Sequence, residues 1–278
     1  MTRTVQQCLA EAARALNPIT DTPRLDSELL MAHALGISRE TLLLGDLHAR
    51  APAAFIPLLN RRMAHEPLAY ITGSRDFWTI SLHVLPGVLI PRPDSETLIE
   101  AAIDHFGRAG PKRVLDLGTG SGALLLAALA HWPETTGLGI DASPVALAIA
   151  QNNADHNGLS DRVKFTAGDW GGGISERFDL VLCNPPYVET TAKLSPDVVE
   201  YEPSSALFAG PEGLDDYRQI IPQLPALIAP GGIVCLEIGC TQAEAVSKLA
   251  VKSGLNALLK YDLAGHPRCL VLSACADA

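Results

Sequence analysis

The sequence lacks the marks of a membrane protein, a secreted protein and a metal-binding protein. Its 278 residues contain no apolar run of about 18 residues, the minimum for a membrane span. The N-terminal residues Met-Thr-Arg-Thr-Val-Gln-Gln are polar where a signal peptide needs an apolar core. The six cysteines form no Cys-x-x-Cys pair, which favours free buried thiols over metal ligands. We therefore expect a soluble cytoplasmic protein without a metal site.

The sequence also has little charge, and that charge is unevenly distributed. Charged residues make up 19% of the chain, which argues against long disordered tails. Residues 1–75 carry eight Arg and Lys against seven Asp and Glu, whereas residues 76–278 carry thirteen against twenty-four, a net charge of −11. Because neither half is basic, we do not expect direct nucleic-acid binding. An acidic half instead suits a basic partner or a cationic cofactor.

The first 75 residues predict a small helical bundle. Apolar spacing and capping residues indicate four helices, over about 5–16, 25–35, 38–44 and 52–65, with Pro52 in the first turn of the last one. No catalytic group stands out in this region, so we interpret residues 1–75 as a substrate-recognition domain. Residues 76–92 are β-rich and predict a hairpin linker, with a turn at Pro86-Gly87 and a second strand over 88–90.

Residues 93–278 predict an α/β catalytic domain. A helix follows Pro93, with Asp94 or Ser95 as its cap, and from Pro111 strands and helices alternate. Strands are expected near 114–117, 138–141, 163–165, 178–183, 233–238, 257–263 and 269–274, with a helix near 215–228. The short link Gly265-His266-Pro267 suits an antiparallel pair, so the sheet should be mostly parallel with an antiparallel last strand.

A glycine turn follows the first of these strands. Gly118, Thr119, Gly120, Ser121 and Gly122 would let a ligand approach the backbone amides at a helix N-terminus. Asp141 ends the next strand, 19 residues after Gly122, where a carboxylate can accept hydrogen bonds from ribose hydroxyls. The alternative is that both are ordinary turn residues, but their β–α–β context favours a nucleoside cofactor.

Two further strand ends carry polar groups. Asp169 and Trp170 end the third strand, where an acid can accept from an adenine amine and an indole can stack on a base. Either residue could equally belong to a surface turn.

Asn184, Pro185, Pro186 and Tyr187 leave the fourth strand. The prolines lack N–H groups, so this loop presents acceptors that can hold a planar NH₂ group, with Tyr187 stacking on it. Taken alone, the loop could also be a strand-end turn with a packed tyrosine.

These motifs, with Leu89-Ile-Pro-Arg-Pro-Asp-Ser-Glu96, Tyr201-Glu-Pro203 and Gly213-Leu-Asp-Asp-Tyr-Arg218, closely resemble the peptide chain release factor glutamine methyltransferases (the HemK/PrmC family). The resemblance implies a Rossmann-like class I methyltransferase fold that uses S-adenosylmethionine. It implies methyl transfer to the side-chain amide nitrogen of the glutamine in the Gly-Gly-Gln loop of bacterial release factors. By position, Gly118 to Gly122, Asp141, Trp170 and Asn184 would contact the cofactor, and Asn184 to Tyr187 would hold the glutamine.

Three alternatives stay open at this point. The Asn-Pro-Pro-Tyr motif is shared with DNA adenine methyltransferases, although the net −11 of residues 76–278 disfavours DNA binding. A glutamine methyltransferase acting on a ribosomal protein is disfavoured by the Pro91-to-Glu96 stretch. A non-catalytic module that only binds S-adenosylmethionine is disfavoured by the complete set of motifs.

Overall fold

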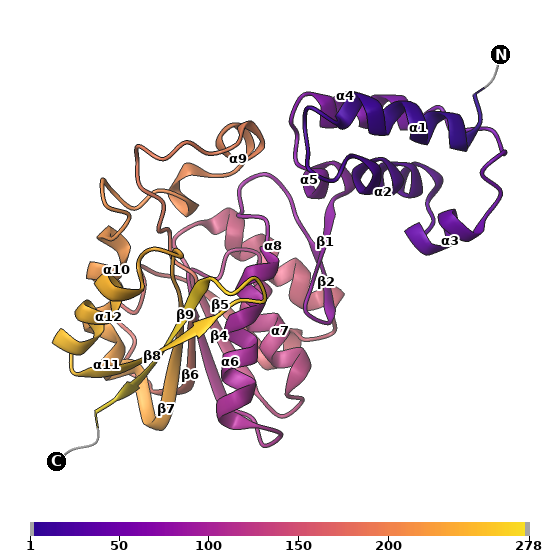
Figure 1. Ribbon diagram of the computed structural model, residues 1–278. Helices are drawn as coiled ribbons and strands as arrows, with labels where there is room; N and C mark the ends of the chain where they lie inside the picture. Colours follow the sequence, from indigo (N-terminus) through magenta and orange to yellow (C-terminus); the bar gives the residue numbers. More distant parts are fainter. Residues whose placement is uncertain (1–2, 276–278) are drawn as a thin grey trace. The chain divides into compact units, whose positions relative to one another are not determined.

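The computed structural model describes residues 3–275 and divides into two compact units (Figure 1). The helical unit contains the described residues up to Ser74 together with Leu194–Tyr201. The sheet unit contains Arg75–Lys193 and the described residues from Glu202 onward. Residues 1–2 and 276–278, which the predicted domains include, lie outside the described residues. Between residues 3 and 275, no helix is long and apolar enough to cross a membrane.

The helical unit contains six α-helices among its described residues: α1 (Val5–Leu16), α2 (Pro23–Leu35), α3 (Arg39–Leu44), α4 (Phe55–Met63), α5 (Leu68–Thr72) and α9 (Pro196–Tyr201). Thr4 and Gln7 cap α1 reciprocally, each side chain accepting from the other's backbone N–H. The four predicted helices are present, but the prediction for Pro52 was wrong, because its carbonyl accepts from Phe55 N–H in a turn before α4. The five residues of α5 are too few to show an apolar period.

The core of the helical unit is apolar but contains one buried ion pair. Leu16, Leu30 and Phe55 are almost fully buried in it. Arg62 Nε donates to Asp26 Oδ2 at 2.8 Å, and the two side chains are only 6% and 7% exposed. Neither partner can lose the other without leaving a charge away from water.

The hairpin is shorter and earlier than predicted. Its strands are β1 (Ser74–Phe77) and β2 (Ile80–His83), so the turn lies at Trp78 and Thr79. Trp78 has a φ of 54°, which is uncommon for a bulky residue, and its N–H donates to Glu96 Oε1 at 2.9 Å. A turn does form at Pro86-Gly87, as predicted, but it does not join the hairpin strands. The predicted strand over Val88–Ile90 was wrong, since residues 88–90 form no strand.

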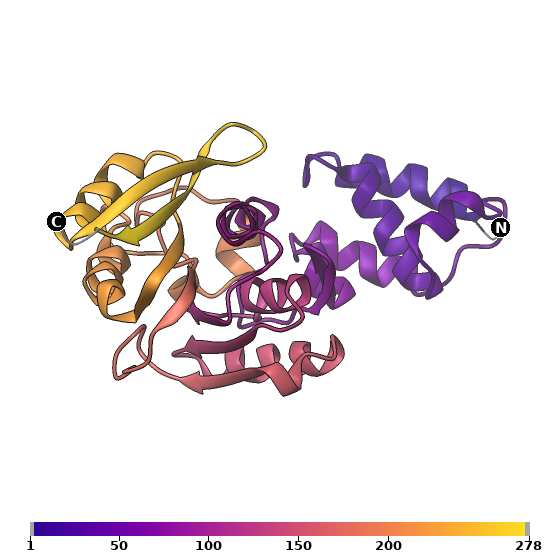
Figure 2. The same cartoon turned by 90° about the horizontal axis from the view of Figure 1, so that it is seen from below.

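The sheet unit is built on seven strands: β3 (Arg113–Leu117), β4 (Thr136–Asp141), β5 (Val163–Ala167), β6 (Phe178–Cys183), β7 (Ile228–Glu237), β8 (Leu255–Tyr261) and β9 (Pro267–Ala274). Their order is β5-β4-β3-β6-β7-β9-β8. The first five are parallel, and β9 runs antiparallel to both of its neighbours, at the yellow edge in Figure 2. The predicted fold class is therefore confirmed.

Helices cover both faces of this sheet (Figure 1). The helical segments of the sheet unit that precede residue 213 are η1 (Pro93–Ser95), α6 (Glu96–Phe106), α7 (Ala123–His131), α8 (Pro144–His156), η2 (Ser160–Arg162) and η3 (Ser204–Ala206). The α6, α7 and α8 helices pack side by side on one face, whereas α10 (Asp215–Ile220), α11 (Leu224–Leu227) and α12 (Ala243–Lys252) lie on the other.

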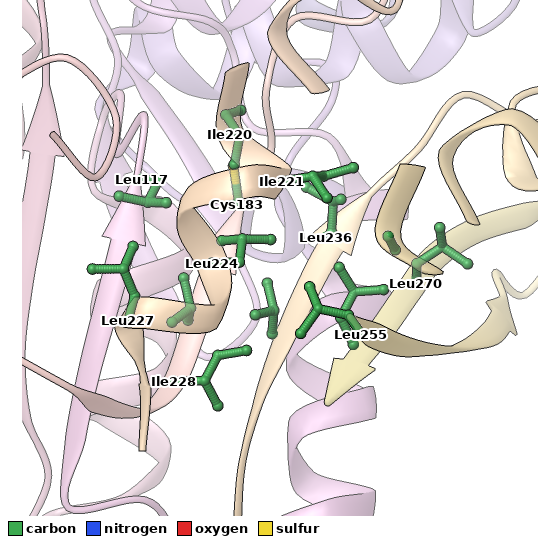
Figure 3. Packing of buried hydrophobic residues seen from close by; sticks show 14 of the residues in the cluster. Leu117, Cys183, Ile220, Ile221, Leu224, Leu227, Ile228, Leu236, Leu255 and Leu270 are labelled. Atoms are coloured by element: carbon green, nitrogen blue, oxygen red, sulfur yellow. The ribbon is translucent and has the colours of Figure 1, made fainter. Parts of the chain in front are cut away.

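The single helix predicted over 215–228 was wrong, because a 3₁₀ turn, η4 (Ile221–Gln223), separates α10 from α11. Pro222 and Pro225 have no N–H to continue an α-helix. The apolar side chains of this broken helix still pack on the sheet. In Figure 3, Ile220, Ile221, Leu224 and Leu227 lie among strand residues of the buried cluster such as Leu117.

The sheet order decides where the polar strand ends meet. Because β5, β4, β3 and β6 are parallel neighbours, their carboxyl ends lie along one edge of the sheet. These four ends lead into Asp169, Asp141, the glycine turn at Gly118 and Asn184, respectively. Open α/β sheets bind their ligands at this kind of edge.

Candidate active site

A cavity of about 480 Å³ lies at this edge and is formed by the sheet unit alone. Its volume is within the roughly 300–1,000 Å³ range of pockets that hold small ligands. Of the predicted site residues, those lining it are Gly118, Thr119, Gly120, Ser121, Asp141, Asp169, Trp170, Asn184 and Pro186. Gly122, Pro185 and Tyr187 are beside it in sequence but are not lining residues.

Asp141 stabilises the glycine turn by accepting a hydrogen bond from it. Gly120 has a φ of 56° and donates its N–H to Asp141 Oδ2 at 2.8 Å. The other oxygen, Oδ1, accepts from Ser143 N–H at 2.8 Å. Each carboxylate oxygen has a second acceptor site, so Asp141 keeps capacity for the hydroxyls of a ribose while it fixes the turn.

Asp116 is a cavity residue that the sequence analysis did not single out. It sits within β3, is 1% exposed, and its Oδ2 accepts from Thr119 Oγ1 at 2.6 Å. Its Oδ1 is buried and has no hydrogen-bond partner among residues 3–275. Burial, opposed by the Thr119 hydrogen bond and assisted by the charge of Asp141, raises the pKa of Asp116 to about 7.

Trp170 lies in a strained conformation against the glycine turn. Its φ of 52° falls in the left-handed region, which is uncommon for a bulky side chain. A Cβ placed on Gly118 would lie 3.1 Å from Cζ3 of the indole, so the ring covers this glycine closely. Asp169 and Asp216 also line the cavity. Burial, together with the charges of Asp215 and Asp169, raises the pKa of Asp216.

Asn184 is oriented by a residue that was predicted to do something else. Its Nδ2 donates to Ser95 Oγ at 3.1 Å, across 89 positions of sequence. The prediction that Ser95 or Asp94 caps α6 was wrong, because no side chain makes a capping hydrogen bond there. With Nδ2 engaged, Asn184 Oδ1 accepts no hydrogen bond from any residue the structure describes, and the side chain lines the cavity.

Tyr187 points its hydroxyl away from the cavity lining. The hydroxyl donates to Glu237 Oε1 at 3.1 Å, and burial together with the charge of Glu237 raises the pKa of Tyr187. Its backbone carbonyl accepts from Gln242 Nε2 at 3.0 Å. A Cβ on Gly213 would lie only 2.3 Å from this same carbonyl oxygen. The Gly213-to-Arg218 motif therefore begins with a residue that must be glycine for the loop to close.

Glu202 joins two cavity walls. Its side chain is 1% exposed, and Oε2 accepts from Ile90 N–H at 3.0 Å while Oε1 binds the guanidinium of Arg92. Leu89 and Pro203, the neighbours of these groups in sequence, both line the cavity. The contacts of Glu202 thus hold the two motifs around Arg92 and Glu202 together beside the cavity.

The lining of the cavity is acidic. Four carboxylates line it, from Asp116, Asp141, Asp169 and Asp216, and the described lining residues include no Lys, Arg or His. Such a site suits a ligand that carries positive charge and disfavours a phosphate backbone.

Comparisons with known proteins agree with this architecture. The family model "PrmC N-terminal domain" matches residues 7–73, and the model "Methyltransferase domain" matches residues 110–265. A release factor glutamine methyltransferase of Rhodospirillum rubrum is 43% identical over 257 residues, which cover 90% of this chain and 79% of that protein. One of Moorella thermoacetica is 38% identical over 276 residues, covering 96% and 98%.

Among solved structures, the 16S rRNA N2 G1207 methyltransferase of T. thermophilus, in complex with AdoMet and guanosine, has a TM-score of 0.55. It is 20% identical and covers 73% of this chain and 50% of that one, a likeness that shows the fold alone. The relatives above are far more similar and extend over both units. The chain belongs to the release factor glutamine methyltransferase family.

Proposed function

We propose that this chain transfers the methyl group of S-adenosylmethionine to the side-chain amide nitrogen (N5) of the glutamine in the Gly-Gly-Gln loop of bacterial peptide chain release factors. The observation that carries the proposal is the hydrogen bonding of the Asn184 side chain. Its Nδ2 is held by Ser95, so its Oδ1 is left to accept a hydrogen bond from an NH₂ group in the cavity. The relatives named above act, by their names, on release factor glutamine.

The cavity fits S-adenosylmethionine, which carries a positively charged sulfonium and an ammonium group. The orphaned Oδ1 of Asp116 is an acceptor that a cation would satisfy. Asp141 is available to the ribose hydroxyls, and Trp170 and Asp169 to the adenine ring and its amine. We assign the turn from Gly118 to Gly122 to the close approach of the methionine part, since its glycine backbone leaves room for it.

When bound, S-adenosylmethionine supplies a methyl group that a nucleophile can displace from sulfur. Asn184 Oδ1 and the carbonyl of Pro185 would accept the two N–H groups of the substrate amide. These acceptors fix the nitrogen in position and stabilise the positive charge that grows on it as the new N–C bond forms. Pro186 lines the cavity, and Tyr187 holds the loop in place through its hydrogen bonds with Glu237 and Gln242. We propose that Tyr187 also packs against the substrate amide. The proton released from nitrogen passes to water.

DNA adenine methylation is the second candidate, because the same loop could hold an adenine amine. The four carboxylates of the cavity disfavour it, since a DNA strand would bring its phosphates toward them. A ribosomal protein glutamine is disfavoured because the relatives that match nearly the whole chain are named for release factors. A module that only binds the cofactor would have no use for an oriented Asn184.

The test is transfer of radiolabel from S-adenosylmethionine to a bacterial release factor. We expect label on the intact factor and none after its loop glutamine is replaced by alanine. Asn184→Ala should retain cofactor binding and lose turnover by about 100-fold or more, as for removal of one acceptor that acts in the transition state. Asn152→Ala, an exposed asparagine on α8, is the matched control and should keep full activity.

Two results would reject the proposal. One is equal labelling of the factor with and without its loop glutamine. The other is labelling of adenine-containing DNA at moderate salt in preference to the release factor, which would establish the second candidate instead.

A further inference from the structure

One glutamine side chain joins three segments of the chain at the carboxyl edge of the sheet. Gln242 immediately precedes α12 and is partly buried. Its Nε2 donates to the backbone carbonyls of Tyr187, at 3.0 Å, and Gly213, at 3.1 Å. Its Oε1 accepts from the N–H of Gly239, in the loop after β7, at 3.0 Å. Both amide protons and the amide oxygen are therefore engaged, each with a different segment.

Two of these segments contribute to the lining of the cavity. The loop that ends at Tyr187 contributes Asn184. The segment that begins at Gly213 runs into α10, which contributes Asp216. Through Gln242, the loop assigned to the substrate amide and the helix that carries Asp216 are both fastened to the same amide group.

The backbone around Gln242 leaves room for an amide at this place. A Cβ on Gly213 would lie 2.8 Å from Gln242 Nε2, and a Cβ on Gly239 would lie 2.7 Å from Gln242 Oε1. Both positions must therefore lack a side chain for the amide to fit. Because Pro185 and Pro186 bring no N–H groups to the loop, donors from outside the loop have to hold it. A glutamine amide, with two protons on one nitrogen, can hold two carbonyls at once.

We propose that Gln242 is a positioning residue, which fixes the loop from Asn184 to Tyr187 relative to α10 and thereby sets the place of the substrate amide beside the bound cofactor. This inference rests on the proposed function of Asn184. A misplacement of about 1 Å can cost on the order of 100-fold in rate, so a small shift of the loop is enough to matter. Among residues 3–275, no hydrogen bond of Gln242 reaches Asp141 or Trp170, so the cofactor should bind without it.

The first test is Gln242→Met, since methionine has a similar length and volume but no N–H to donate. For the methylation of a release factor, we expect kcat per cofactor-binding molecule to fall about 10- to 100-fold. The dissociation constant for S-adenosylmethionine should stay close to that of wild type. A purely structural role would instead lower the free energy of unfolding and leave the kcat of the folded molecules unchanged. The matched control is Gln151→Met, at an exposed position of α8, which should keep full activity.

A double-mutant comparison tests whether Gln242 acts through the loop. In the Asn184→Ala background the acceptor that the loop positions is already gone, so Gln242→Met should lower kcat much less there than in the wild-type background.

Gly239→Ala disturbs the same amide without removing it. The φ of Gly239 is not positive, so alanine can adopt this backbone, but its Cβ would lie 2.7 Å from Gln242 Oε1 and displace the side chain. We expect this variant to lower kcat while the dissociation constant for S-adenosylmethionine stays close to that of wild type.

A wild-type kcat in Gln242→Met would overturn the proposal, as would an equal loss from this substitution with and without Asn184. If Gln242→Met fails to fold, Gly239→Ala decides alone, and an unchanged kcat in that variant rejects the role of Gln242. Failure of the proposed function would look different, because the wild-type protein would then not label the release factor.

Discussion

Replacing Asp116 by asparagine should stabilise the cofactor-free protein at alkaline pH while weakening its affinity for S-adenosylmethionine. The pKa of this buried carboxyl rises from 3.8 to about 7, chiefly because burial disfavours its charged form. At 1.36 kcal/mol per pKa unit, the ionised group costs the folded state about 4 kcal/mol at pH 8. Asparagine removes the charge and can still accept the hydrogen bond from Thr119. The gain in the free energy of unfolding should therefore approach, and not exceed, this figure.

The sign of the pH dependence follows from the same shift. Between about pH 4 and pH 7 the folded protein binds a proton at Asp116 that the unfolded chain has released, so stability falls as the pH rises through this window. Glu237 is shifted in the same direction to about 7 and adds a similar slope. The Asp116→Asn variant should thus keep roughly half of the combined pH dependence and gain most of its advantage above pH 7.

Cofactor binding should respond in the opposite direction. A cation placed against the orphaned Oδ1 favours the charged carboxylate, so binding to the wild-type protein near pH 6.5 should release a proton. Loss of this charge-assisted contact should raise the dissociation constant by about 10- to 150-fold, the equivalent of roughly 1.5–3 kcal/mol. Urea unfolding at pH 5 and pH 8 measures the stability. Titration calorimetry in buffers of different ionisation enthalpy measures the affinity and the released protons.

The control is Asp161→Asn, a change of the same chemistry at an exposed position, which should alter neither quantity. A variant that is no more stable than wild type at pH 8 would show that Asp116 is not a buried charge in the free protein. If proton release persists unchanged in Asp116→Asn, the group that titrates on binding is a different one, and the assignment of Asp116 to the cationic cofactor is refuted.

Two further substitutions test the loop and the helical unit. Gly213→Ala should lower both kcat and the free energy of unfolding, because its Cβ would lie 2.3 Å from the Tyr187 carbonyl oxygen. The control is Gly231→Ala, also at positive φ but with open space around it, which should cost only about 1 kcal/mol of strain. Equal effects of the two substitutions in kinetic and urea-unfolding measurements would contradict the close contact between Gly213 and the Tyr187 carbonyl. Arg62→Ala should destabilise the protein by about 3–5 kcal/mol in urea unfolding by leaving Asp26 buried without its partner, and a loss below 1 kcal/mol would mean that water reaches this pair.

The sequence predicted the sheet well where local pattern and long-range pairing agree. The apolar runs of β3 and β6 and the glycine turn between β3 and α7 were found at their observed positions. The start of β7 was missed because Pro230-Gly231-Gly232 has the composition of a loop. A Cβ on Gly232 would lie 2.6 Å from the carbonyl oxygen of Asp179 in β6, so this glycine serves strand pairing. That role is visible only once the two strands are adjacent.

The prediction of the hairpin's position was wrong for a related reason. Pro86-Gly87 is the stronger turn signal in the sequence and does form a turn, yet the turn that joins the two hairpin strands lies at Trp78 and Thr79. Nothing local favours a tryptophan at positive φ. Its N–H is satisfied by Glu96, a residue 18 positions later, and this contact supports a conformation that local sequence would reject. Local turn rules cannot detect support of this kind.

At the candidate site, the sequence identified strand ends but not the carboxylates behind them. Residues after a strand are recognisable because polar groups and prolines interrupt an apolar run, as at Asn184. Asp116 and Glu237 lie inside such runs, where a single acidic residue does not by itself indicate a functional site. Yet a carboxylate that is about 1% exposed, with one oxygen unpaired, opposes folding. An acid within a strand that ends beside a ligand edge is therefore the signal to look for. At Asp116 the unfavourable burial is offset only if the charge acts on a group that binds later, which we propose is a cationic cofactor.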